Sequence, residues 1–174
     1  MTSPEVNAWC MPGGKIAVYT GLIDKLQVTD DELAAVMGHE IAHALREHGR
    51  ERASQHMAAG ISASLMGILA DIFLPGTGQL ATEGAALGTG VGVLLPYSRV
   101  HETEADRIGV ELAARAGYDP RAAIARWQKM AKVSGGSAPP QLLSTHPSNE
   151  ARIKDLTEFS RKVLPLYENA RAES

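Results

Sequence analysis

Residues 29–45 read TDDELAAVMGHEIAHAL and predict a long helix with a well-defined first turn. Thr29 can accept a hydrogen bond from the amide of Glu32, whose carboxylate can accept one from the amide of Thr29, which makes a capping box. Acidic residues in this turn also suit the positive end of the helix dipole. The apolar residues at helical spacing are Leu33, Val36, Met37, Ile41, Ala44 and Leu45. They predict that one face of the helix packs against a core.

The same helix carries the pattern H-E-x-x-H at residues 39–43. Residues four apart lie on one face of a helix, so the imidazoles of His39 and His43 can bind a single tetrahedral Zn²⁺ ion. Glu40 projects beside them, where its carboxylate can take a proton from a water molecule. Both histidines fall to one side of the apolar stripe, as residues lining a cleft would. The pattern also occurs on solvated helices with ordinary surface histidines, so the remaining ligands decide its meaning.

A catalytic zinc ion usually takes three protein ligands. The extended pattern H-E-x-x-H-x-x-G-x-x-H fails here, because Arg46 replaces its glycine and His48 stands one position too early. We therefore interpret His48, His56 and His101 as surface or packing residues. Glu47, one turn beyond the motif, is a weaker rival ligand that we expect to face water.

A better third ligand lies in residues 98–106, SRVHETEAD. On a predicted helix over residues 100–116, Glu102 and Asp106 fall on a face of small and apolar residues. Burying two unpaired carboxylates is costly, and a metal ion together with a histidine N–H would offset that cost. We predict that Glu102 is the third ligand and that Asp106 accepts a hydrogen bond from a ligating imidazole. The alternative is that both acids form salt bridges with Arg99 or another base.

These residues together resemble the M48 metallopeptidases, a gluzincin family that couples H-E-x-x-H on one helix to E-x-x-x-D on a later helix. Three further segments look like pieces of that family in the expected order. They are Asn7–Trp9 followed by residues 13–23 (GGKIAVYTGLI), residues 104–109 (EADRIG) and residues 144–148 (STHPS). The resemblance covers roughly residues 6 to 160, which is nearly the whole chain.

The resemblance implies a zincin-like metallopeptidase domain with one zinc ion and polypeptide substrates. It is closest to soluble, periplasmic bacterial members that act in envelope protein quality control, which implies a periplasmic or membrane-associated location. The expected fold class is α+β and mainly α, with a small antiparallel hairpin beside the zinc helix. An association with a membrane or with envelope proteins stays open.

Length and composition limit the classes of protein to which the chain can belong. The chain has 174 residues, 44% of them hydrophobic, and a formal net charge of −3. We expect a single catalytic domain over residues 1–174. No clustered basic face points to a nucleic acid. Cys10 is the only cysteine, which excludes an intrachain disulfide, and we expect a small buried hydrophobe there. The first residues do not resemble a signal peptide, so we expect a domain excised from a longer precursor.

Residues 57–96 look like an insert between the two metal helices. The apolar run 61–74 is shorter than the roughly 20 residues that a membrane span needs, and a glycine-rich stretch follows it. We predict a helix, a flexible loop and a second short helix. The insert is either a packed hairpin, or a lid, or a surface that faces a membrane or a partner.

The remaining elements frame the proposed cleft. Residues 15–20 are predicted to form a strand that pairs with an extended substrate backbone, or an ordinary core strand. Gly117 is expected to cap the second metal helix. A further helix is predicted from Asp119-Pro120 to Val133, with a linker-like loop over residues 135–140. Ser148 is expected to cap a last helix that runs toward Arg161.

His146 is the ambiguous residue. Pro147 favours an extended backbone before it, so His146 can enter the cleft from a loop. There it would stabilise an oxyanion or occupy the open zinc position as a removable fourth ligand; alternatively it merely caps the loop. Arg152 is a weaker candidate for the same cleft.

The predicted function is zinc-dependent endopeptidase activity on misfolded or envelope proteins. In it, Glu40 is the general base toward a zinc-activated water. Two rivals remain. One is a non-peptide metal-dependent amide or ester hydrolase. The other is a latent or chaperone-like zinc protein whose site is closed by His146. Glu40 counts against a purely structural zinc site, which needs no carboxylate at that position.

Overall fold

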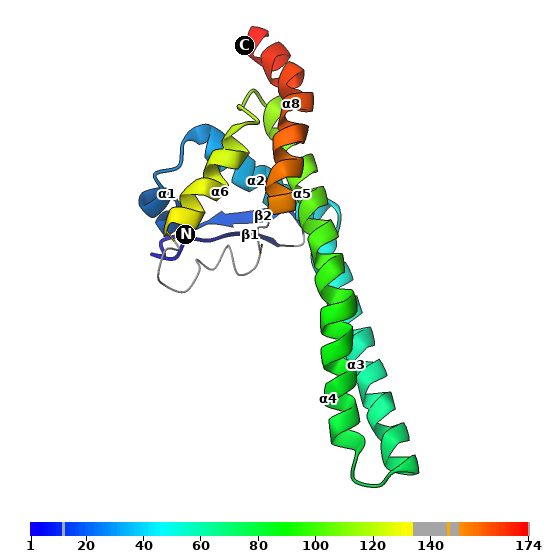
Figure 1. Cartoon of the computed structure of the whole chain (residues 1–174). Coiled ribbons are helices and arrows are strands. Elements are labelled where there is room, and N and C mark those ends of the chain that lie inside the picture. The colour runs from blue at the N-terminus through cyan, green and yellow to red at the C-terminus, as the bar shows by residue number, and fades with distance from the viewer. Residues whose placement is uncertain (12, 134–145, 147–149, 174) are drawn as a thin grey trace. The chain divides into compact units, whose positions relative to one another are not determined.

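A computed structural model describes residues 1–11, 13–133, 146 and 150–173 of the chain (Figure 1). By their internal contacts these residues divide into two units. Residues Met1–Arg46 and Glu102–Ser174 make the first unit, and Glu47–His101 make the second. The predicted insert, residues 57–96, falls within the second unit.

The first unit begins with a two-stranded antiparallel sheet. Strand β1 (Ala8–Met11) pairs with β2 (Lys15–Val18), with Ala8 opposite Val18. The turn between the strands contains Gly13 and Gly14, both at positive φ, a conformation that glycine adopts without strain. Both strands contact the helix that carries the H-E-x-x-H pattern, β1 more extensively.

The first unit also contains five described helical segments: α1 (Thr20–Leu26), α2 (Asp30–Leu45), the part of α5 (Leu95–Arg115) from Glu102 onward, α6 (Ala122–Val133) and α8 (Glu150–Ala172). The predicted capping box is present at the start of α2. Leu22, Val36, Trp127 and Leu156 are among the buried side chains that join these helices in one core. The mainly helical α+β class with a small sheet is confirmed.

Several predicted boundaries are wrong. The strand at residue 15 ends at Val18, and Thr20 instead starts helix α1, which the sequence analysis missed. Helix α6 begins at Ala122 rather than at Pro120, and α8 continues to Ala172 rather than ending near Arg161. Cys10 is half-buried instead of buried. The expected loop 135–140 and the expected cap Ser148 lie outside the described residues.

Helices α2 and α5 approach each other at two glycines. A Cβ atom on Gly38 would lie 2.4 Å from the carbonyl oxygen of Gly109, and one on Gly109 would lie 2.5 Å from the backbone nitrogen of His39. Only residues without a Cβ allow this backbone contact. The contact places the first histidine of α2 directly against α5.

The second unit is a helical hairpin. Helix α3 (His48–Phe73) is followed by α4 (Gly78–Thr89), the π-helical segment η1 (Gly90–Leu94) and the first turns of α5. Helices α3 and α4 lie side by side (Figure 1). The predicted short apolar run is part of a 26-residue helix, which is long and apolar enough to cross a membrane by length and composition. The expectation that this segment is too short for a span is therefore wrong.

Candidate metal centre

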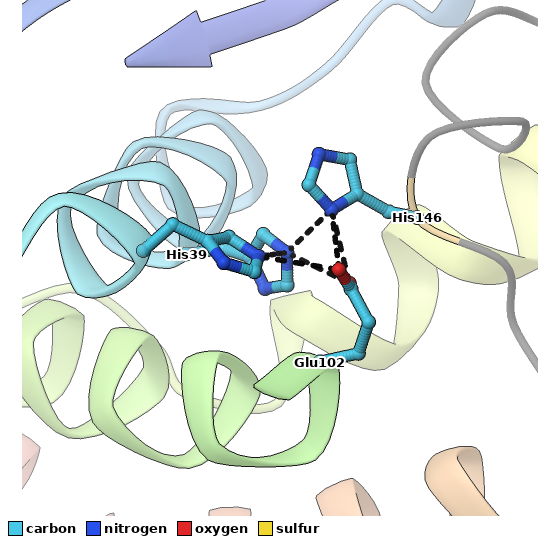
Figure 2. Close-up of side chains that lie close together, drawn as sticks. His39, Glu102 and His146 are labelled. Carbon is cyan, nitrogen blue, oxygen red and sulfur yellow. Dashed lines mark hydrogen bonds and ion pairs between the residues drawn. The ribbon is translucent and has the colours of Figure 1, made fainter. Parts of the chain in front are cut away.

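Four side chains of the first unit bring potential metal-binding atoms together. They are His39, His43, Glu102 and His146, and one ligand atom from each lies within 4.8 Å of the others. Helix α2 supplies the first two and helix α5 supplies Glu102. Figure 2 shows the His39 and His146 rings and the Glu102 carboxylate pointing toward one another.

The two motif histidines lie one helical turn apart on the same face of α2. Their Nε2 atoms are 3.1 Å apart, and their rings meet edge to face. Glu102, only 1% exposed, faces both rings, with its oxygens 3.3 Å from Nε2 of His39 and 3.4 Å from Nε2 of His43. The geometry expected from H-E-x-x-H on a helix is therefore present.

His146 completes the group. Its Nδ1 atom lies 3.0 Å from both carboxylate oxygens of Glu102 and 3.3 Å from Nε2 of His39. Two positions for this ring were open from the sequence: capping a loop or entering the cleft. The ring lies in the cleft, among the other three candidate ligands.

The spacing of these atoms fits one small cation. Atoms that bind Zn²⁺ tetrahedrally at about 2.0–2.1 Å lie about 3.3–3.4 Å from one another. Five of the six separations, from 3.0 to 3.4 Å, are close to the edges of such a tetrahedron, and the sixth, between His43 and His146, is within 4.8 Å. Two imidazoles plus a carboxylate, with a third imidazole, is also a donor set that zinc accepts.

Asp106 lies behind the cluster and not in it. Its Oδ1 is 3.0 Å from Nδ1 of His39, the ring nitrogen that points away from the other candidate ligands. A carboxylate there fixes the proton on Nδ1 and leaves the Nε2 lone pair free for a cation. The predicted contact between Asp106 and an imidazole of the motif is present, and its role in orienting a metal ligand stays a prediction.

Arg152 pairs with both acids of α5. Its Nη1 is 3.1 Å from Glu102, its Nη2 is 3.0 Å from Asp106, and its Nε also donates to Asp106. The alternative of salt bridges with a base is thus realised by Arg152, and the histidine contacts exist beside it. Arg152 is buried and reaches this site from helix α8.

A second buried arginine was missed. Arg126 on α6 lies 4.0 Å from Asp106, and it and Arg152 both lie over the ring of Trp127, at 4.7 and 4.5 Å from the centroid. Burial lowers the pKa of the Arg126 guanidinium to about 10, which still leaves it charged at neutral pH. In sequence, the pair Arg126-Trp127 looks like an ordinary helix surface, so only the fold reveals this role.

Glu40 is buried beside the cluster, and its Oε1 has no hydrogen-bond partner within the described parts of the chain. The same oxygen lies 3.5 Å from Nε2 of His146. An orphaned buried carboxylate oxygen is costly, and a water molecule that donates to it would remove that cost. The role of Glu40 as a general base toward such a water stays a prediction.

The charges of the site also favour a cation. Burial lowers the pKa of His43 to about 4, which keeps its ring neutral, as metal binding requires. Burial opposes charge on His39, but hydrogen bonds to Asp106 and Glu102 outweigh it and raise the pKa of that ring. Burial likewise opposes ionisation of Glu102, yet contacts with three histidines hold its pKa far below the usual range. A bound divalent cation would balance the negative charge of the Glu102 carboxylate, which a proton on His39 balances otherwise.

The remaining histidines and Glu47 lie elsewhere. His48 and His101 are buried and stack on each other in the second unit, with ring centroids 4.2 Å apart, and His56 is exposed. Glu47 is exposed and pairs with Arg50. These positions fit packing and surface roles.

Comparison with known proteins gives consistent matches. The profile of Peptidase family M48 matches residues 1–160. Mitochondrial metalloendopeptidase OMA1 of Arabidopsis thaliana is 38% identical over 174 residues, which cover 99% of this chain and 33% of that protein. The Beta-barrel assembly-enhancing protease of Escherichia coli (strain K12) is 30% identical over 171 residues, which cover 95% of this chain and 34% of that protein. The chain thus spans about a third of the length of these two relatives.

Proposed function

The chain belongs to Peptidase family M48, and on this premise we propose that it is a zinc-dependent endopeptidase with Glu40 as the general base. The observation that carries the proposal is the convergence of His39, His43 and Glu102 beside a buried Glu40 oxygen that accepts no hydrogen bond from the described residues. These three side chains would hold one Zn²⁺ ion. When bound, the ion would lower the pKa of a water molecule toward about 7 and polarise the scissile carbonyl.

The protein's own groups would then move the proton. Oε1 of Glu40 would accept a proton from the attacking water and later donate it to the nitrogen of the leaving amine. Asp106 would hold His39 in one tautomer throughout, and Arg152 would keep both α5 carboxylates ionised and in place. No covalent intermediate with the protein is needed.

His146 would act as a removable fourth ligand. A catalytic zinc site keeps one position open, whereas four protein ligands close it. The Nδ1 atom of His146 lies at tetrahedral-edge distances from Glu102 and His39, which favours a closed, latent arrangement over an oxyanion role. Displacement of His146 would open the position for water next to Glu40.

The natural substrate is proposed at the level of class only. The relatives are named as a mitochondrial metalloendopeptidase and as a protease that enhances β-barrel assembly. We infer polypeptide substrates, misfolded or envelope proteins among them, and a periplasmic or membrane-associated location. Strand β2 (Lys15–Val18) remains the proposed partner for an extended substrate backbone.

Digestion of casein by the zinc-loaded chain tests the proposal. The variant Glu40→Gln should keep its zinc but lose about 10²–10⁴-fold in activity, the range that general base catalysis contributes. Glu47→Gln removes an exposed carboxylate outside the site and should leave the rate unchanged. Full activity of Glu40→Gln would end the general-base assignment. Turnover of small amides or esters with no cleavage of casein would favour the non-peptide hydrolase.

A further inference from the structure

The hairpin of the second unit places its large and small residues in an unusual way. On α3 the small residues Ala63 and Gly67 are buried, whereas large apolar side chains are exposed. The exposed ones on this helix are Met57, Ile61, Leu65, Met66, Ile68, Leu69, Ile72 and Phe73. At about 100° per residue they span about half of the helix circumference. A helix of a water-soluble protein normally buries such residues and exposes polar ones.

The small residues let the two arms of the hairpin touch. A Cβ atom on Gly67 would lie 1.9 Å from Oγ1 of Thr82 and 2.8 Å from the carbonyl oxygen of Gly78. Close contact through small residues is how helices associate inside lipid, where burying large apolar side chains against each other gains little. The second arm of the hairpin, made by α4 and η1, also exposes large apolar side chains. They are Leu80, Leu87, Val91 and Val93.

Two simpler explanations for an apolar helix do not fit α3. A core helix of a globular domain is mostly buried, but the apolar stretch of α3 is only 11% buried. A signal sequence lies near the start of a chain and is followed by the mature domain. Helix α3 instead lies between the two helices that carry the candidate ligands.

Charged residues bound the apolar part at both ends. Residues 53–70 and 84–98 contain no Asp, Glu, Lys or Arg. As helices, these 18 and 15 residues would be about 27 and 22 Å long, close to the roughly 30 Å hydrocarbon core of a bilayer. Arg52 and Arg99 lie at the base of the hairpin, and Asp71 and Glu83 lie toward its tip.

Several polar groups of the hairpin pair with backbone groups of the same hairpin. The hydroxyls of Ser62, Ser64, Thr82 and Thr89 each donate to the carbonyl four residues earlier in their own helix. At the tip, the Asp71 carboxylate accepts from the amides of Gly76 and Gly78. Internal pairing of this kind is what a hydrocarbon environment demands, because no water is available there.

We propose that residues 53–98 form a hairpin that inserts across a lipid bilayer, with its apolar part in the hydrocarbon core. The charged base lies at one membrane surface, and Asp71 and Glu83 lie near the other. The hairpin thereby anchors the chain to a membrane. The occupant of the exposed surface is lipid, because the exposed apolar side chains of α3 span about half of its circumference, which is more than the single stripe that a groove on a protein partner would contact.

Flotation with protein-free phosphatidylcholine vesicles tests the proposal and does not depend on peptidase activity. The detergent-purified full chain, reconstituted and centrifuged through a density gradient, should float with the lipid. It should also resist extraction by 1 M salt, at which the Debye length is only about 3 Å, because the binding is apolar. Leu65→Glu combined with Ile68→Glu, two exposed positions in the middle of the hairpin, should shift most of the protein to the bottom fraction.

The matched control is Ile23→Glu, which places the same charge on an exposed apolar position of α1 in the first unit. It should float like the unchanged chain. An unchanged chain that stays at the bottom, a double variant that still floats, or a control that also fails to float would overturn the proposal. A third result would also overturn it: the unchanged chain does not float but forms a dimer in vesicle-free buffer, and the double variant is monomeric. The exposed apolar surface of the hairpin would then bind a second copy of the chain instead of lipid.

Insertion depth separates a spanning hairpin from one that lies on the surface. In a Cys10→Ser background, an environment-sensitive fluorophore on Leu65→Cys should shift to the blue with vesicles. Lipids brominated near the ends of their acyl chains should quench it, and the same label on Arg50→Cys at the base should be quenched by lipids brominated near the headgroup. Quenching of the Leu65→Cys label only by the shallow lipids would overturn the spanning arrangement.

Discussion

At the scale of single residues, the site depends on which nitrogen of His39 faces the other proposed ligands. The contact between Nδ1 of His39 and Asp106 leaves Nε2 directed at His43, Glu102 and His146. Arg152 and Arg126 balance the buried negative charge around it. A ligand ring in a fixed orientation binds a metal with less loss of conformational freedom than a mobile ring.

Asp106→Asn tests this orienting role. Because an amide holds the imidazole less firmly and removes a buried charge, we expect zinc affinity to fall about 10–100-fold. Competition with a fluorescent chelator gives the dissociation constant. Asp155→Asn is the control, since Asp155 forms a partly exposed ion pair with Arg107 and should leave the affinity unchanged. Equal affinities for Asp106→Asn and the unchanged chain would refute the role.

His146→Ala tests the closing role of the fourth ligand. Removing the ring opens one coordination position, so we expect the rate of casein cleavage to rise at least about tenfold, while zinc stays bound through three ligands. His56→Ala, at an exposed histidine of α3, should change neither quantity. A large loss of kcat in His146→Ala, with zinc retained, would instead support the oxyanion role.

At the scale of elements, the site depends on the close crossing of α2 and α5. Gly38 and Gly109 let the two backbones meet, and the proposed ligands are His39, which follows Gly38 on α2, and Glu102, about two turns before Gly109 on α5. Any side chain here would push the helices apart and separate the ligand pairs, whose atoms are only 3.3 Å apart.

Gly109→Ala should therefore weaken both the fold and the zinc site. Forcing a methyl group into a packed contact costs roughly 1–3 kcal/mol of the free energy of unfolding, and zinc affinity should fall about tenfold or more with it. Urea unfolding and zinc titration measure the two effects. Gly60→Ala is the control, because a Cβ at Gly60 would meet nothing within 4 Å and alanine favours the helix. A neutral Gly109→Ala would show that the crossing is not needed.

The elements also show what sequence reasoning can reach. Helix α2 was predictable because its cap, its charges and its apolar spacing are all features of the local sequence. The prediction that Glu102 and Asp106 approach the H-E-x-x-H residues rested on the occurrence of two acidic residues among small residues. Helix α1 was not predictable, since the β-branched residues before it favour a strand. Gly21 is needed there because a Cβ would lie 2.4 Å from the backbone of Pro4, a contact that only the fold reveals.

The length of α3 was missed for a different reason. Its alanines, glycines and serines dilute the apolar signal, so only the run after Ile61 stood out. The partners of Arg126 and Arg152 are distant in the sequence, and no local pattern predicts such contacts. Local signals thus predicted the two helices that carry His39, His43 and Glu102, and the tertiary fold supplied the charged groups that surround these residues.

At the scale of the whole molecule, the site joins segments that are far apart in the chain. Helix α2 and helix α5 are separated in sequence by the entire hairpin, and His146 comes from a third segment. A metal ion bound by all of them would stabilise the folded first unit over the unfolded chain. Membrane anchoring through the hairpin is a separate property of the second unit.

Anomalous scattering at the zinc absorption edge, from crystals of the zinc-loaded chain, would locate the proposed ion and its ligands in one experiment. We expect a single strong peak about 2.0–2.2 Å from Nε2 of His39, Nε2 of His43 and a carboxylate oxygen of Glu102. A peak that Glu102 does not contact, or no peak between α2 and α5, would refute this zinc site.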